Sequence, residues 1–180
     1  LGRKRDNTAY AQSVWRNTIA APGTLVETYL RSRGIHVSPP PAVRFTPSLK
    51  HSDGGPFPAM VAGVTKWPGD RVDTIHRTYL RRDGLGKASV NGPKRMLGSV
   101  KGGAVRLGAP GETLAVGEGI ETCLSVMEAT GIPTWACLSS SNFQTLMLPA
   151  LPLASTVLIA ADNDEVGLGA ARCARKRWML

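Results

Sequence analysis

The sequence predicts an α/β protein in which a parallel sheet flanked by helices follows a small, basic α+β part with an N-terminal helical hairpin. Three patterns favour this fold class. Strand-like and helix-like segments alternate after Gly111, turn residues break up short β-like runs before it, and two helical patterns open the chain. We therefore predict three parts: residues 1–38, 39–110 and 111–180.

Composition sets the broad class. The chain has 180 residues, 42% of them hydrophobic, which suffices for a core. Three cysteines without a C-x-x-C pair argue against a disulfide framework and a cysteine zinc site. A reducing cytoplasm is therefore the expected compartment. No apolar run approaches the roughly 18–20 residues of a membrane span, so we expect no membrane attachment. Because the chain lacks an initial Met and ends within an expected helix, we expect an excised fragment whose last domain is truncated.

The first part predicts two helices. Residues 8–19 place apolar side chains close to one face, and Pro22-Gly23 ends the pattern. A second helix is expected over residues 24–34. The run Ser38–Pro41 contains three consecutive prolines and predicts a stiff connector.

The middle part predicts a small antiparallel sheet. Turn signals at Pro68-Gly69-Asp70 and Asp83-Gly84 separate the apolar runs. One run interleaves apolar residues with His76, Arg77 and Arg81, so we expect a strand that buries one face and presents cations on the other. The four expected strands are residues 43–45, 59–65, 74–80 and 104–107.

The last part alternates strands with helices. Apolar runs end at Gly117, Leu138 and Ala161, and the pattern after Gly119 repeats with helical spacing. Such an order predicts a parallel sheet with right-handed crossovers and a ligand site at the carboxyl ends of its strands. We expect strands over residues 113–117, 134–138 and 156–161, and helices over residues 120–129 and 167–178.

Acidic residues follow two of these strands. Glu118 comes directly after the first, and Asp162 and Asp164 come after the last. The net charge is +9, yet no Lys or Arg lies between Gly111 and Glu165. Carboxylates gathered without cationic partners repel each other, and a divalent cation relieves that repulsion. The basic remainder of the chain suits a phosphate backbone, so metal-assisted chemistry on nucleic acid is indicated.

The motif Gly117-Glu118-Gly119, with Asp162-x-Asp164-x-x-Gly167 after the later strand, resembles the signature of the Toprim domain. Toprim domains occur in DnaG-type primases, topoisomerases and some nucleases. The amino-acid sequence of residues 117–125 resembles the Toprim segment of phage- and plasmid-type primases. In some of these proteins the primase is joined to a helicase. Four upstream segments resemble the basic subdomain that precedes Toprim in DnaG-type enzymes: residues 76–80, 86–87, 94–98 and 103–107.

This resemblance implies a DNA primase, a nucleotidyltransferase that synthesises short RNA primers on single-stranded DNA during replication. Nucleoside triphosphates and the template would be its substrates, and a replicative helicase, fused or separate, a further partner. Glu118, Asp162 and Asp164 would hold Mg²⁺ or Mn²⁺, with Glu118 acting either in metal binding or in acid/base chemistry. The alternative is that these carboxylates cap helices.

Several further residues are candidates for the same site. Gly117, Gly119 and Gly167 would let the backbone approach phosphates or metal, or would serve simply as turn glycines. Glu121 either faces the pocket or complements a helix N-terminus. The loop of residues 139–142 either lines the site, as in the family, or is an ordinary polar turn.

Basic residues of the upstream segments are candidates for contacts with template or triphosphate. Arg77 and Lys94 are the best candidates, and Lys87, Arg95 and Arg106 are weaker ones. The alternative for each is a surface cation with no ligand.

Two other functions remain open. The chain could cleave DNA as a Toprim nuclease or topoisomerase, although a topoisomerase needs a tyrosine nucleophile and the three tyrosines lie in expected helices or strands. It could also be a non-catalytic nucleic-acid-binding module. DnaG-type primases use a further acidic residue downstream, so we expect this chain to bind metal incompletely.

Overall fold

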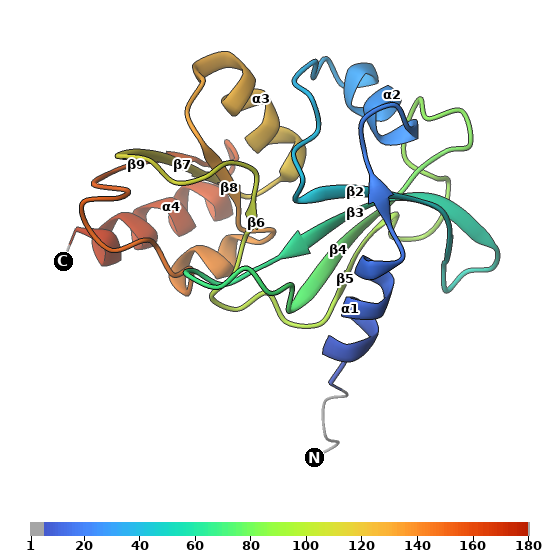
Figure 1. The fold of residues 1–180 in the computed structure, drawn as a ribbon. Helices are drawn as coiled ribbons and strands as arrows, with labels where there is room; N and C mark the ends of the chain where they lie inside the picture. The colour runs from blue at the N-terminus through green and yellow to red at the C-terminus, as the bar shows by residue number, and fades with distance from the viewer. Residues whose placement is uncertain (1–5, 180) are drawn as a thin grey trace. The chain divides into compact units, whose positions relative to one another are not determined.

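The computed structural model describes residues 6–179, which form two compact units (Figure 1). The first unit holds the residues up to Gly34 together with Ser38–Val64 and Arg71–Ser99. The second unit holds Ile35–Val37, Thr65–Asp70 and the residues from Val100 onwards. The division at residues 38 and 110 that we expect from the sequence remains a prediction.

The first unit is built on a five-stranded antiparallel sheet with the order β1-β2-β3-β4-β5. Its core joins Ala11 and Trp15 of helix α1 to Val61, Ile75 and Tyr79 on one face of the sheet. The elements of this unit are α1 (Thr8–Arg16), β1 (Ile19–Ala20), α2 (Leu25–Ser32), β2 (Val43–Lys50), β3 (Pro56–Val64), β4 (Thr74–Tyr79) and β5 (Lys94–Leu97).

Helix α1 ends at Arg16, so the expected helix over residues 8–19 is too long. Ile19 and Ala20 instead form β1 and pair with Phe45 and Arg44 of β2. Thr18 closes the helix end by donating its hydroxyl to the carbonyl oxygen of Trp15 at 2.6 Å. Strand pairing with β2 therefore overrides the helical sequence pattern at Ile19.

Strand β4 is buried on both faces, and the prediction that one of its faces presents cations is wrong. Ile75 and Tyr79 are buried on one face, while His76 and Thr78 are buried on the other. Helix α1 packs on the face of β4 that carries Ile75 and Tyr79. Arg77 is half-buried, and Arg81 lies beyond the end of the strand.

The second unit contains a four-stranded sheet with the order β6-β8-β7-β9. Strand β7 is parallel to both β8 and β9, as the alternating pattern predicts, and β6 is antiparallel to β8. The elements are β6 (Val105–Arg106), β7 (Thr113–Gly117), α3 (Ile120–Thr130), β8 (Thr134–Ala136), the 3₁₀ helix η1 (Ser140–Gln144), β9 (Thr156–Ala160) and α4 (Glu165–Trp178).

Strand β6 belongs to a different sheet from the one that the sequence predicts. The sequence assigns residues 104–107 to the antiparallel sheet of the middle part, but Val105 and Arg106 pair with Ala136 and Trp135 of β8. The first sheet gains β5 instead, a strand that the sequence analysis does not predict because its residues alternate weakly.

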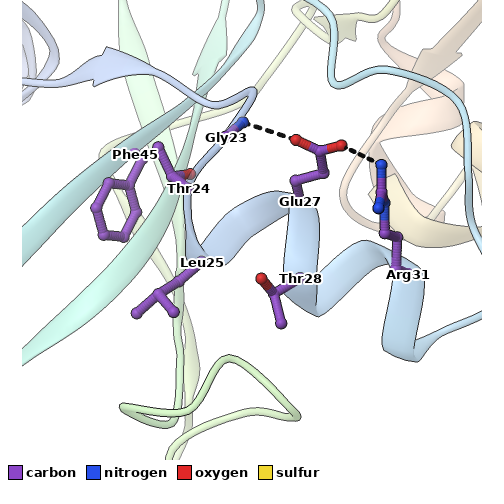
Figure 2. A pocket seen from close by; sticks show the side chains of 7 residues that line it. All are labelled: Gly23, Thr24, Leu25, Glu27, Thr28, Arg31 and Phe45. Atoms are coloured by element: carbon purple, nitrogen blue, oxygen red, sulfur yellow. Dashed lines mark hydrogen bonds and ion pairs between the residues drawn. The ribbon is translucent and has the colours of Figure 1, made fainter.

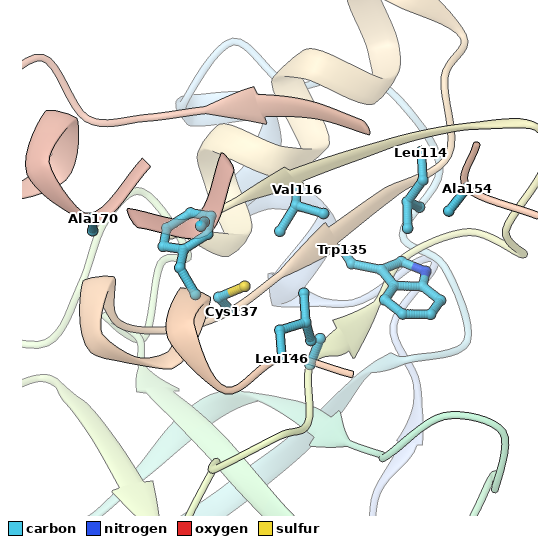
Figure 3. Packing of buried hydrophobic residues seen from close by; sticks show 10 residues of the cluster. Leu114, Val116, Trp135, Cys137, Leu146, Ala154 and Ala170 are labelled. Carbon is cyan, nitrogen blue, oxygen red and sulfur yellow. The ribbon is translucent and has the colours of Figure 1, made fainter. Parts of the chain in front are cut away.

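The core of the second unit lies between its sheet, η1 and α4. Leu114 and Val116 of β7 pack with Trp135 of β8 and with Leu146, and Ala170 contributes from α4 (Figure 3). Four of these five residues are at most 1% exposed, and Ala170 is 8% exposed. Burial of this apolar surface fixes β7 and β8 side by side and so determines where their carboxyl ends lie. None of the described helices is long and apolar enough to cross a membrane.

Candidate functional site

The three predicted acidic residues follow two adjacent parallel strands. Strands β7 and β9 are paired so that Gly117 lies opposite Ala160, the last residue of each strand. Glu118 is the next residue after β7, and Asp162 lies two residues beyond the end of β9. Because the strands are parallel and end together, these carboxylates lie at one edge of the sheet.

The electrostatics of Glu118 show that the carboxylates affect one another. The pKa of Glu118 is raised above its ordinary value, first by burial of the side chain and next by the charge of Asp162. The charge of Asp164 raises it further, and a hydrogen bond from the backbone N–H of Ser140 opposes the shift. Glu118 is half-buried, whereas Asp162 and Asp164 are exposed. The ionised form of Glu118 therefore destabilises the folded chain when no cation is bound.

Asp164 is also the N-cap of helix α4. Its Oδ1 accepts a hydrogen bond from the backbone N–H of Gly167 at 2.7 Å. Asp164 therefore caps a helix, which is the alternative role that the sequence leaves open for these carboxylates. Since a carboxylate has two oxygens, this bond is compatible with cation binding by the other one.

Across residues 6–179, the side chains as they stand form no group of three or more His, Cys, Asp or Glu residues able to hold a metal ion. The chemistry of the donors nevertheless fits a hard divalent cation. Glu118, Asp162 and Asp164 offer only carboxylate oxygens, and their mutual repulsion would be relieved by bound Mg²⁺ or Mn²⁺.

Two of the three predicted glycines are required by close packing. A Cβ atom at Gly117 would lie 2.8 Å from Sγ of Cys123, and a Cβ atom at Gly167 would lie 2.5 Å from the carbonyl oxygen of Asp162. Gly119 differs, because its nearest neighbour would be Oγ1 of Thr122 at 3.4 Å. Gly117 therefore allows close packing against the side chain of Cys123, and Gly167 allows close packing against the backbone of Asp162.

We expect Gly167→Ala to destabilise the protein by about 1–3 kcal/mol, because the new methyl group meets the backbone of Asp162, which has little freedom to move. Gly119→Ala should cost less than about 1 kcal/mol, since the N-cap of α3 has room for the methyl group. Urea unfolding of the two variants measures the difference. Equal losses would contradict the close packing of Gly167 against Asp162.

The basic candidates of the first unit differ in their surroundings. Arg77 donates from Nη2 to the carbonyl oxygen of Met96 at 3.0 Å. Arg95 donates from Nε to Nε2 of His51 at 3.1 Å and is half-buried. Lys94 is exposed on β5, and Lys87 is half-buried. Lys94 is therefore the most accessible of these four cations.

Arg106 belongs to the second unit and is embedded in protein contacts. Its Nε donates to Oγ1 of Thr65 at 2.7 Å, and its guanidinium forms an ion pair with Asp70. The same group lies 5.5 Å from the ring centre of Trp67 and 5.7 Å from that of Trp135. With only 14% of its side chain exposed, Arg106 has a clear packing role.

A pocket of about 520 Å³ lies in the first unit beside α2 (Figure 2). Glu27 accepts hydrogen bonds from the backbone N–H of Gly23 and from the guanidinium of Arg31, each at 2.6 Å. These contacts satisfy the charged groups around the pocket internally, so it offers no site comparable to the acidic edge. The pocket is lined by Gly23, Thr24, Leu25, Glu27, Thr28, Arg31 and Phe45.

One group near Glu118 is missed by sequence reasoning, which leaves residues 139–142 open as either a site loop or an ordinary turn. The backbone N–H of Ser140, within this segment, lowers the pKa of Glu118 and so opposes the shift caused by burial and by the neighbouring carboxylates. No side-chain pattern signals this contact, because the donor is a backbone group and any residue type except proline supplies it.

Residues 113–179, which contain the parallel strands β7 and β9 and the carboxylates that follow them, match the Toprim domain family. Such domains bind metal and process nucleic acids in enzymes such as primases, nucleases and topoisomerases. Residues 5–107 match the family described as "Domain of unknown function (DUF7146)", and the chain belongs to that family. The search among curated proteins found no match.

Proposed function

We propose that this chain is the catalytic core of a DNA primase, which synthesises short RNA primers on single-stranded DNA in the cytoplasm. The observation that supports this most is the set of three carboxylates beyond the ends of β7 and β9. The raised pKa of Glu118 adds to it, because it marks a group kept beside like charges at a cost to stability.

In this proposal Glu118, Asp162 and Asp164 hold Mg²⁺ or Mn²⁺. When bound, the metal supplies stabilisation of the negative charge that develops on the attacking 3′-oxygen and on the departing pyrophosphate. Glu118 acts either as a ligand or in proton transfer to and from the reacting oxygens.

The basic residues bind template or triphosphate in the same proposal. Residues 1–110 contain 18 Lys and Arg against 6 Asp and Glu, an excess that attracts a phosphate backbone. We assign the leading role to Lys94, which is exposed, and to Arg77. Lys87, Arg95 and Arg106 are assigned supporting contacts, and Arg106 is the least accessible of these because it stacks on two tryptophans.

The proposal is tested by primer synthesis on single-stranded DNA with labelled ribonucleotides and either Mg²⁺ or Mn²⁺. We expect template-dependent products that disappear when EDTA is added. The assay compares this chain with a version extended at its C-terminus, since a further downstream carboxylate is expected in this class. Metal-dependent shortening of the template would support the nuclease alternative, and DNA binding without any product from either version would support a binding module.

A further inference from the structure

Helix α4 (Figure 1) has one buried face and one exposed, basic face. Ala170 and Ala174 are buried and belong to the core of the second unit. Arg172, Arg175 and Lys176 are exposed, and the last two lie three and four residues after the first. Side chains at these spacings are neighbours on a helix surface. The three cations therefore form one group, which we call the α4 basic stripe.

The α4 basic stripe has no anionic partner within the part of the chain that the structure describes. None of its three side chains forms an ion pair or a hydrogen bond with residues 6–179. The sequence from Val166 to Met179 contains no Asp or Glu, so helix α4 supplies no carboxylate at a neutralising position. Because like charges at these spacings repel each other, an anion from outside the chain would stabilise the stripe.

The helix dipole explains only part of this pattern. Cations in the last turn of a helix are favourable, and Arg175, Lys176 and Arg177 lie in the last turn of α4. Arg172 lies a turn earlier, where the effect of the dipole has faded. Arg177 has a contact of its own, because its Nη1 donates to the carbonyl oxygen of Leu146 at 2.9 Å. The stripe is therefore more than a helix end or a packing contact.

A pocket of about 550 Å³ adjoins the stripe at Arg175. Arg175 is the one charged residue among its described lining residues, and the half-buried Trp178 contributes an aromatic ring. Val157 and Ile159 of β9, with apolar residues from the segment 148–154, supply most of the remaining lining. An apolar pocket with an aromatic ring beside a cation suits a nucleobase and the phosphate attached to it.

We propose that the α4 basic stripe and this pocket form a binding surface for single-stranded DNA. Phosphates contact Arg172, Arg175 and Lys176, and a base enters the pocket beside Trp178. Basic surfaces next to stacking aromatic rings are a common means of holding single strands. A duplex fits less well, because its paired bases would have to leave the stack to enter the pocket. The inference deepens the proposed function, on which the choice of DNA rests.

Neutralising the stripe should weaken the binding of a single strand in a salt-dependent way. The variant is Arg172→Gln/Arg175→Gln/Lys176→Gln, and the probe is fluorescein-labelled oligothymidylate, followed by anisotropy in EDTA so that no metal takes part. We expect affinity to fall roughly 10- to 100-fold at about 0.1 M salt. The slope of log affinity against log salt concentration should become smaller by about 2, which corresponds to three phosphate contacts.

The matched control removes the same amount of charge from cations that already have partners. Arg31, Arg71 and Arg81 are exposed, and each forms an ion pair with a carboxylate of the first unit. We expect Arg31→Gln/Arg71→Gln/Arg81→Gln to bind oligothymidylate within about twofold of the wild type, since exposed pairs contribute little. Equal losses in the two triple variants would overturn the inference by assigning the effect to net charge.

Alkylation of Cys173 locates the bound strand without any substitution, and so serves if the stripe variant fails to fold. Cys173 is exposed and adjoins Arg172, whereas Cys123 and Cys137 are buried. N-ethylmaleimide should therefore modify Cys173 first, and saturating oligothymidylate should slow this reaction. An unchanged rate would overturn the inference while leaving the proposed function standing.

Two further strands test the pocket. An abasic strand of the same length keeps the phosphates and should bind the wild type about 10-fold more weakly, and Trp178→Leu should narrow this difference. Equal binding of the two strands by the wild type would overturn the base contact. A duplex that binds as tightly as oligothymidylate would overturn the assignment to single strands. A wild-type chain that binds oligothymidylate as expected but makes no primers would refute the proposed function and leave the binding surface standing.

Discussion

Replacing Glu118 with Gln is expected to lower the rate of primer synthesis by roughly 10²- to 10⁴-fold, the range for loss of a group engaged in acid/base catalysis. The same change should stabilise the metal-free protein. In the wild type the Glu118 carboxylate is partly buried and repelled by Asp162 and Asp164, and a neutral amide of the same shape avoids both costs. Opposite effects on activity and stability are typical of a residue retained for function.

The stability effect should depend on pH in a defined direction. Because the pKa of Glu118 is raised in the folded state, the folded protein binds more protons than the unfolded chain above the ordinary pKa of 4.5. The contribution of Glu118 to unfolding free energy therefore falls as pH rises from about 4.5 through the raised pKa, and then levels off. Melting curves in EDTA should show the gain of Glu118→Gln at neutral pH and its disappearance below about pH 4.

Glu121→Gln is the control for this experiment. Glu121 lies in the first turn of α3 and, unlike Asp162, is no source of the raised pKa of Glu118. Loss of its charge should cost at most about 1 kcal/mol through the helix dipole and should leave primer synthesis nearly unchanged. Equal activity losses in the two variants would assign the effect to the general charge of this region and would count against a specific role for Glu118.

The acidic edge could be predicted from the sequence because it depends on local patterns. The apolar runs that end at Gly117 and Ala161 predict strands, and alternation with helices predicts that they are parallel, as β7 and β9 are. Once two parallel strands are neighbours, the residues after them share an edge whatever the remaining packing does. The local pattern therefore places Glu118, Asp162 and Asp164 after strand ends, and the pairing of β7 with β9 brings these ends to one edge.

Features that depend on distant partners could not be predicted. Residues 104–107 have strand character, but only their pairing with Trp135 and Ala136 assigns them to the second sheet. Ile19 looks helical until its pairing with Phe45 is known. Likewise, the sequence cannot show that Arg106 stacks on two tryptophans or that Asn142 binds a turn forty residues before it. Side-chain periodicity reports the local conformation, whereas these contacts are set by the whole fold.

The largest loss of stability is expected for Trp135→Ala, at about 3–5 kcal/mol. Trp135 is 1% exposed and lies in the middle of β8, where it packs in the core with Leu114 and Leu146. Its Nε1 donates to the carbonyl oxygen of Gly108 at 3.0 Å. Truncation would leave a large cavity and an unpaired carbonyl, and should lower the melting temperature by roughly 6–20 °C.

Trp135→Phe provides the comparison, since it keeps most of the ring volume and should cost markedly less than the alanine variant. Trp135 lies opposite Val116 of β7, and Val116 is two residues before Glu118. The alanine substitution should therefore also disturb the strand that precedes this carboxylate. Because this effect on activity passes through folding, primer synthesis by Trp135→Ala should recover on cooling, whereas that of Glu118→Gln should not. A Trp135→Ala variant that melts within about 2 °C of the wild type would show that the second unit is not organised around this side chain.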